Sequence, residues 1–89
     1  MKITDVLREL GARYCIRIMD NELVIYRDFG DYDVEVSGLE FPKASFKAVI
    51  YLWNKRQGFV DETFEVKSLP ELESKLNEIS SRYSNQLPD

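Results

Sequence analysis

The first ten residues carry apolar side chains at the spacing of one helix face. These positions are Ile3, Val6, Leu7 and Leu10. Intervals of three and four residues are the period of an amphipathic helix. Thr4 or Asp5 can cap its start, and Gly11 stands where a helix would end. Residues 3–10 are therefore predicted to form a short helix.

Three segments that follow are predicted strands: the first and third alternate apolar and polar side chains, and the second is a short apolar run. They cover residues 14–18, 23–26 and 32–36. Asp20 and Asn21 separate the first two segments, and residues 29–31 (Phe-Gly-Asp) separate the second and third. Both connections contain residues that are favoured in turns. A three-stranded meander is predicted.

The segment 46–53 fits two structures. Phe46, Val49, Ile50 and Trp53 have the spacing of a helix face, but the β-branched and aromatic content of the segment favours a strand. We therefore predict a fourth strand, a turn at 55–58 and a fifth strand at 59–66. The apolar set of the fifth strand is Val60, Phe64 and Val66.

The last helix has a start signal in the sequence. Ser68 and Glu71 have the S-x-x-E spacing of a capping box, and Pro70 lies in the first turn, where its missing N–H costs nothing. The expected buried stripe is Leu69, Leu72, Leu76, Ile79 and Tyr83. We expect one domain over residues 1–84 and a polar tail at 85–89.

The element order α-β-β-β-β-β-α predicts an α+β fold in two layers, with both helices on one face of an antiparallel sheet. Strand parity assigns one set of side chains to the helix-covered face: Tyr14, Ile16, Ile18, Val34, Val36, Phe46, Ala48, Ile50, Leu52, Phe64 and Val66. The opposite face is expected to show Arg17, Asp33, Glu35, Lys47, Val49, Tyr51, Trp53 and Glu65, together with Tyr26.

Composition narrows the function classes. Among 89 residues there is no histidine and one cysteine, Cys15. The commonest general base and transition-metal ligand is thus missing, and no internal disulfide can form. The N-terminus lacks the apolar core of a signal peptide, and no glycine-rich phosphate loop occurs. We expect a cytoplasmic, non-enzymatic protein without a cofactor, a metal or a membrane span.

Charge is unevenly distributed. Residues 41–60 contain no acid but four basic side chains: Lys43, Lys47, Lys55 and Arg56. Residues 20–40 contain seven acids and only one basic residue: Asp20, Glu22, Asp28, Asp31, Asp33, Glu35 and Glu40, with Arg27. Neighbouring basic and acidic strands can simply exchange weak surface ion pairs.

Tyr51 and Trp53 are the candidate contact residues. An aromatic patch on an open sheet face is typical of a protein interface, and the partner could be another protein or a second copy of this chain. Val49, Lys47 and Tyr26 would share that patch. Nucleic acid is the alternative ligand, because the basic residues Lys43, Lys55 and Arg56 flank the rings. The net charge of −4 opposes it.

The acidic residues Asp28, Asp31, Asp33 and Glu35 form a second candidate surface. Their spacing does not match the calcium-binding loop, so no metal is expected. Alternation sends Asp31, Asp33 and Glu35 to one side of their strand, which is typical of a solvated acidic edge.

The N-terminal segment MKITDVLREL, followed by the strand YCIRI, resembles the start of small phage anti-CRISPR proteins that inhibit a type II CRISPR effector nuclease. The matching positions are Met1, Ile3, Asp5, Arg8 and Glu9, with aliphatic residues at Val6, Leu7 and Leu10. The resemblance implies a stoichiometric inhibitor whose acidic surface occupies a DNA-binding site. Asp28, Asp31, Asp33 and Glu35 are the residues that could take that role.

Overall fold

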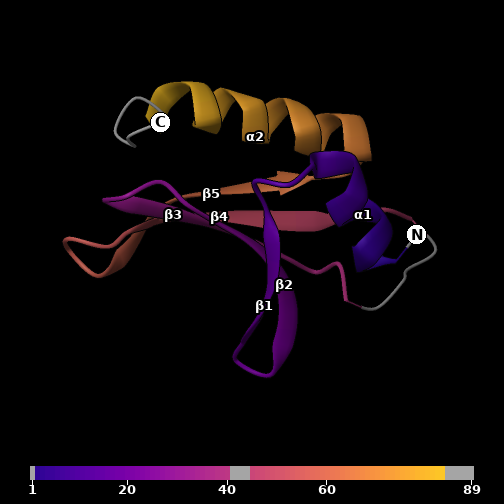
Figure 1. Ribbon diagram of the computed structural model, residues 1–89, viewed down its shortest axis with the longest axis horizontal. Helices are drawn as coiled ribbons and strands as arrows, with labels where there is room; N and C mark the ends of the chain where they lie inside the picture. Colours follow the sequence, from indigo (N-terminus) through magenta and orange to yellow (C-terminus); the bar gives the residue numbers. More distant parts are fainter. Residues whose placement is uncertain (1, 41–44, 84–89) are drawn as a thin grey trace.

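The computed structural model describes residues 2–40 and 45–83. Its elements are α1 (Ile3–Leu10), β1 (Cys15–Met19), β2 (Glu22–Asp28), β3 (Tyr32–Ser37), β4 (Ala48–Asn54), β5 (Phe59–Val66) and α2 (Leu69–Tyr83). The five strands form one antiparallel sheet in the order β1-β2-β3-β4-β5. Both helices lie on the same side of this sheet (Figure 1). The predicted α+β meander is confirmed; Lys43 and the tail predicted at 85–89 lie outside the described residues.

The β1–β2 turn is the two-residue hairpin turn that its sequence predicts. Asp20 and Asn21 have φ values of 52° and 65°, and Met19 pairs directly with Glu22 across the turn. Such a turn needs a positive φ at both central residues, and Asn and Asp tolerate this conformation better than other non-glycine residues. The short turn therefore sets the register of the whole hairpin.

The ambiguous segment forms a strand, β4. It pairs with β3 on one side and with β5 on the other, so it lies inside the sheet. Its side chains alternate strictly between buried and half-buried from Ala48 to Asn54. Because a central strand packs on two neighbouring strands, it favours the β-branched and aromatic residues found here.

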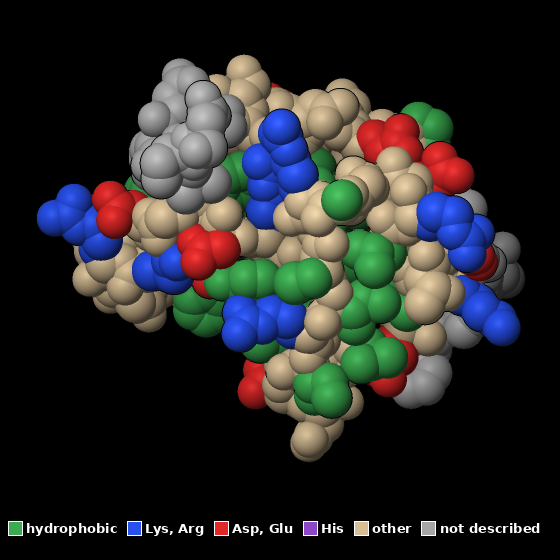
Figure 2. Space-filling view, in the orientation of Figure 1, with side chains coloured by type: hydrophobic (Ala, Val, Ile, Leu, Met, Phe, Trp, Pro, Cys, Tyr) green, Lys and Arg blue, Asp and Glu red, His purple; other side chains and the backbone are tan. Residues whose placement is uncertain are grey.

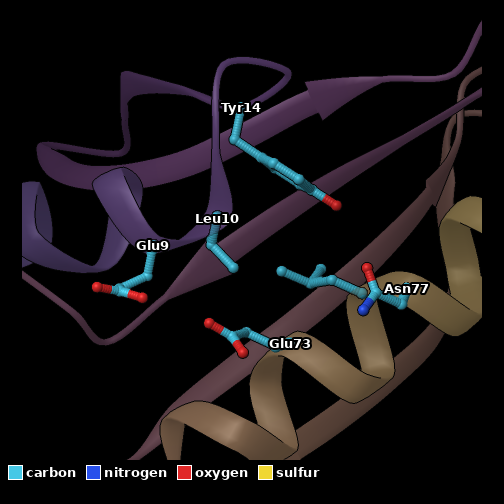
Figure 3. Close-up of a pocket in the computed structure, with 6 residues that line it drawn as sticks. Glu9, Leu10, Tyr14, Glu73 and Asn77 are labelled. Atoms are coloured by element: carbon cyan, nitrogen blue, oxygen red, sulfur yellow. The ribbon is translucent and has the colours of Figure 1, made fainter.

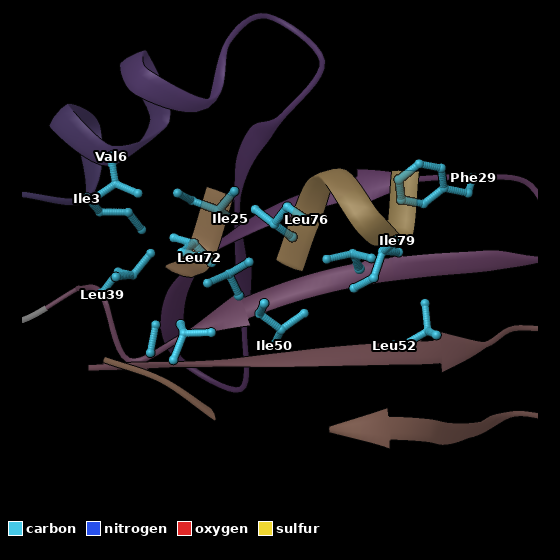
Figure 4. Close-up of a cluster of buried hydrophobic side chains, with 14 residues drawn as sticks. Ile3, Val6, Ile25, Phe29, Leu39, Ile50, Leu52, Leu72, Leu76 and Ile79 are labelled. Atoms are coloured by element: carbon cyan, nitrogen blue, oxygen red, sulfur yellow. The ribbon is translucent and has the colours of Figure 1, made fainter. Parts of the chain in front are cut away.

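The core lies between the sheet and the two helices (Figure 4). Leu72, Leu76 and Ile79 of the predicted α2 stripe are fully buried, while Leu69 and Tyr83 pack at its edge. The sheet contributes a continuous apolar surface through the buried side chains of Ile25, Val34, Val36, Ala48, Ile50, Leu52 and Val66. Tyr14, Ile16, Phe46 and Phe64 are partly buried against this cluster. Most of the residues predicted on the helix-covered face of the sheet therefore do lie there.

Ile18 departs from the predicted core. Its side chain is on the helix-covered face by register but is 72% exposed. The β1–β2 hairpin extends beyond the helices at its turn (Figure 1), so no helix covers this residue. The expectation that Ile18 faces a helix is wrong because parity gives the side of a strand and not what lies above it.

Val60 also departs from the predicted pattern. Leu52 pairs with Glu62 but Trp53 pairs with Val60, so the ladder is irregular at this point and Asp61 is the extra residue of β5. A bulge of this kind reverses the parity of the residues beyond it. Val60 therefore lies on the face opposite the helices, away from Phe64 and Val66. Glu62 faces α2 instead and accepts a hydrogen bond from Arg82 at 2.8 Å.

The helix starts follow the predicted chemistry in part. Ser68 Oγ accepts a hydrogen bond from the Glu71 backbone N–H at 3.2 Å, which confirms the predicted cap of α2. In α1 the cap position belongs to Lys2, and not to Thr4 or Asp5. Asp5 lies in the first turn, where its carboxylate accepts a hydrogen bond from the Lys2 backbone N–H at 3.0 Å.

Phe29 and Arg27 are buried although the pattern did not predict it. Phe29, predicted only as part of a turn, is fully buried. Arg27 is 9% exposed, and its guanidinium lies 4.4 Å from the Phe29 ring centroid and 5.3 Å from that of Tyr14. It also donates a hydrogen bond to Ser80 Oγ at 3.2 Å. The aromatic faces and this hydroxyl stabilise a cation that would otherwise be costly to bury.

Candidate functional site

The face of the sheet opposite the helices, here called the open face, collects the predicted contact residues. Strand pairing places Glu35 directly between Tyr26 on β2 and Tyr51 on β4. Asp33 pairs with Trp53 in the same way. Aromatic and acidic side chains therefore stand side by side across three adjacent strands. Strand parity already predicted Asp33, Glu35, Tyr51 and Trp53 on one face, and the register shows which of the acids and rings are direct neighbours.

A small hollow of about 270 Å³ lies on the open face, and we call it the open-face pocket. Its apolar lining comes from Met19, Val24, Tyr51, Trp53 and Val60, and its polar lining from Asp20, Glu22, Glu35 and Ser37. Val24 is only 1% exposed although it is not part of the core under the helices. The side chains of the open face thus form a second, smaller packed layer.

Trp53 is half-buried within this layer. Its Nε1 atom is buried and has no hydrogen-bond partner among the described residues. A buried indole N–H usually finds an acceptor, so this donor is unusual in the described part of the chain. Trp53 lies on the predicted face, and its half-burial shows that neighbouring side chains already cover part of its ring.

Glu35 is the acid at the centre of the open face. Burial raises the pKa of its carboxyl above the ordinary value. Three neighbouring carboxylates add to this increase in pKa: Asp20, Glu22 and Asp33. Within residues 2–40 and 45–83, its carboxylate makes no hydrogen bond and no ion pair. Among the described residues, Glu35 is therefore an acid without a paired cation, in a place where ionisation is unfavourable.

Glu22, by contrast, is held in place by its neighbours. Its carboxylate accepts hydrogen bonds from Ser37 Oγ at 2.9 Å and from the Gly38 backbone N–H at 2.7 Å. These contacts join the start of β2 to the end of β3. They orient one wall of the open-face pocket before any partner is bound.

Tyr26 and Asp33 border the same surface. Tyr26 Oη donates a hydrogen bond to Asp33 at 2.8 Å, and burial together with this bond raises the pKa of Tyr26 to about 12. The Arg17 guanidinium lies 4.3 Å from the Tyr26 ring centroid. The open face already contains one arginine stacked on an aromatic ring.

Two residues of the predicted basic patch, Lys55 and Arg56, lie beside carboxylates. Lys55 Nζ lies 2.7 Å from Asp28, and this contact is the main cause of a lowered pKa of the Asp28 carboxyl. Arg56 lies 3.8 Å from Asp31. In the space-filling view, basic and acidic side chains alternate at the end of the molecule that carries the β4–β5 turn (Figure 2). In this region the basic and acidic segments form ion pairs with one another, as the sequence analysis allowed.

The other residues of the predicted basic patch and of the predicted acidic surface also differ in their contacts. Lys47 lies 3.8 Å from Glu65 at the far end of the open face. Asp28 and Asp31 contact Lys55 and Arg56 at the turns. Asp28 also pairs with Asp33 in the register, but Asp33 and Glu35 form no ion pair within the described residues. The four acids predicted as one surface therefore separate into two pairs with different surroundings.

Sequence reasoning missed several residues of the open-face pocket. Glu22 and Met19 flank the Asp20–Asn21 turn, and the predicted second strand began one residue too late to include Glu22. Its parity with Val24 and Tyr26 is a signal that could have placed it on the open face. No local signal indicates Val60, because its position depends on the bulge in β5.

A second hollow, of about 330 Å³, lies between the end of α1, the start of β1 and α2. Glu9, Leu10, Tyr14, Glu73 and Asn77 line it (Figure 3). Its two glutamates come from different helices and are not joined by a third acid. No group of three or more candidate metal ligands occurs in the part of the chain that the structure describes.

Neither described helix has the length and apolar character needed to cross a membrane. Comparison of the chain with protein-family models, with curated proteins and with solved structures finds no match. The arrangement of the open face is thus the basis for a functional proposal.

Proposed function

We propose that this chain is a small non-enzymatic regulator that binds another protein through the open face of its sheet. The observation that carries the proposal is the cluster formed by Tyr51, Trp53 and Glu35. Their strands are adjacent, no helix covers them, and a pocket opens between them. Aromatic side chains around a concave, partly apolar surface are typical of the centre of a protein interface.

The charges around the pocket favour a protein over a nucleic acid as the partner. Asp20, Glu22 and Glu35 line the pocket and would repel phosphates. The basic residues Lys55 and Arg56 lie beside carboxylates at the turns. Stacking of bases on Tyr51 and Trp53 would therefore lack the cationic track that single-stranded nucleic acids need.

The resemblance of the N-terminal segment to anti-CRISPR proteins supports an inhibitor as the kind of regulator. By that resemblance, an inhibitor of a nucleic-acid-binding enzyme would use an acidic surface. In that case the open face, with Asp33 and Glu35, takes the inhibitory role, while Asp28 and Asp31 stay paired at the turns.

The proposal can be tested by capture from a lysate of the native host, with immobilised wild-type chain and matched variants. The double variant Tyr51→Ala, Trp53→Ala removes both rings from the open face. Phe59→Ala removes an exposed ring elsewhere and serves as the control. Thr63→Arg, opposite Tyr51 in the register, places a long side chain on the open face without removing packing.

A protein that binds wild type and Phe59→Ala but neither open-face variant would support the proposal. If both rings are anchors, the double variant should lose several kcal/mol of binding free energy, on the order of 2 kcal/mol for each ring. Equal capture by all variants would contradict it. Sedimentation equilibrium would show whether a second copy is the partner. Binding of single-stranded DNA that falls steeply with salt, and persists in Thr63→Arg, would favour nucleic acid instead.

A further inference from the structure

We propose that the open-face pocket receives an arginine side chain of the partner protein, with its guanidinium between the carboxylates of Glu35 and Glu22 and the rings of Tyr51 and Trp53. This inference rests on the proposed function and names the chemistry that the partner must present. The partner is accordingly expected to contact the open face with a basic segment.

The size of the pocket fits one side chain. Its volume of about 270 Å³ falls below the roughly 300–1,000 Å³ of pockets that hold drug-sized ligands and cofactors. The pocket is set into a sheet face, so a chain lying on that face can insert a residue from above. A whole nucleotide or cofactor would be left mostly outside it.

The charge of the pocket requires a cation. Glu35 is half-buried without a hydrogen bond or ion pair in the described part of the chain, and acids surround it on β2, β3 and the β1–β2 turn. Two described cations of the same face are engaged elsewhere. Arg17 lies over Tyr26, and Lys47 lies beside Glu65. An incoming cation would remove the repulsion among these carboxylates.

The walls of the pocket favour arginine over lysine. A guanidinium is planar, weakly hydrated and able to stack on an aromatic face while it donates to carboxylates on its edge. This chain already places two guanidinium groups over aromatic rings. The guanidinium groups of Arg17 and Arg27 lie 4.3 and 4.4 Å from the ring centroids of Tyr26 and Phe29. Tyr51 and Trp53 offer comparable surfaces next to Glu35.

Trp53 makes the inference measurable, because it is the only tryptophan in the chain. Its indole N–H gives a single NMR signal that reports on the pocket wall. The probe is the blocked tripeptide Gly-Arg-Gly, acetylated and amidated at its ends. The matched neutral probe replaces arginine with citrulline, which has nearly the same shape but no charge. Glu35→Gln removes the central carboxylate, and Glu73→Gln makes the same charge change on α2.

We expect a saturable shift of the Trp53 indole signal with the arginine peptide and none with the citrulline peptide. Glu35→Gln should weaken binding by about tenfold or more, as expected for loss of a charged hydrogen-bond partner. Glu73→Gln should bind like wild type. An equal response to citrulline, unchanged binding by Glu35→Gln, or no response to arginine in the wild-type chain would overturn the inference.

Failure of the arginine inference can be distinguished from failure of the proposed function. If the open-face variants lose a captured protein but Glu35→Gln retains it, the open face binds a protein without an arginine in the pocket. If the arginine peptide binds but the open-face variants capture the same proteins as wild type, the pocket is real and the proposed interface is wrong.

Discussion

Tyr26 Oη donates a hydrogen bond of 2.8 Å to the carboxylate of Asp33, and this contact joins β2 to β3 on the open face. The two residues are diagonal neighbours, since Tyr26 pairs with Glu35 and Asp33 pairs with Asp28. Diagonal pairs are within reach of an aromatic side chain in an antiparallel sheet. The phenol therefore positions one acid of the open face, while Glu35 beside it has no hydrogen-bond or ion-pair partner among residues 2–40 and 45–83.

Burial of the phenol, together with this bond, raises the pKa of Tyr26. Its pKa in the folded chain is about 12, compared with 10.0 for a free tyrosine. Because the folded pKa is the higher one, the stabilising contribution is complete below pH 10 and is lost as the pH rises through about 12. Phenolate absorbance should lose one late-titrating tyrosine in Tyr26→Phe, while Tyr32, whose pKa is also raised through Asp61, should still titrate late.

Asp33→Asn should lower the pKa of Tyr26 toward the ordinary value, because the amide can accept the hydrogen bond but carries no charge. Asp31→Asn, two residues earlier and beside Arg56, serves as the control and should leave the pKa of Tyr26 where it is. An absorbance titration that is the same in Tyr26→Phe and wild type would show that another residue titrates late.

Glu35→Gln is predicted to stabilise the free chain at neutral pH. Burial and neighbouring acids raise the pKa of Glu35, so the folded chain binds its proton more tightly than the unfolded chain does. Stability is therefore lost as the pH rises through the titration range of this carboxyl, and glutamine avoids that loss. Thermal unfolding should give a Tm a few degrees higher for the variant at about pH 7.

The Tm difference should disappear at about pH 3, where the carboxyl is protonated in both states. Glu73→Gln should match wild type at both pH values. A lower Tm for Glu35→Gln at neutral pH would contradict this prediction, because it would mean that the carboxylate stabilises the free chain.

Leu72→Ala and Leu76→Ala are each predicted to destabilise the chain by about 2–5 kcal/mol, because they leave a cavity between α2 and the sheet. Both side chains are fully buried. A domain of this size has a free energy of unfolding of only about 5–15 kcal/mol. Urea denaturation would measure the loss. The exposed substitution Ser81→Ala should change the free energy of unfolding by less than about 0.5 kcal/mol.

Arg27 offers a test of how a buried cation is stabilised. Arg27→Ala should cost about 1–3 kcal/mol, since it removes the group that packs between Tyr14 and Phe29. Arg27→Met should cost less, because it keeps most of the volume and avoids burying a charge. Equal losses of free energy of unfolding in urea would show that the cation itself, through the rings and Ser80, is what stabilises this region.

The elements of this fold were predictable from local patterns. Strand alternation, the Asp20–Asn21 turn and the Ser68 cap each depend on residues within a few positions of one another, and the structure confirms all three. The placement of Tyr51 and Trp53 on the open face also follows from alternation within β4. Local chemistry suffices here because the backbone period and the turn conformations are themselves local properties.

The composition of the candidate site depends on pairing between distant residues. The bulge between β4 and β5 moves Val60 to the open face, and the register of β3 between β2 and β4 brings Glu35 beside Tyr51. The length of the β1–β2 hairpin beyond the helices leaves Ile18 exposed, and the meeting of two turns pairs Lys55 with Asp28. Alternation gives the side of a strand to which a residue points. Which strand lies beside it, in which register and under which helix, is set by packing of the whole chain.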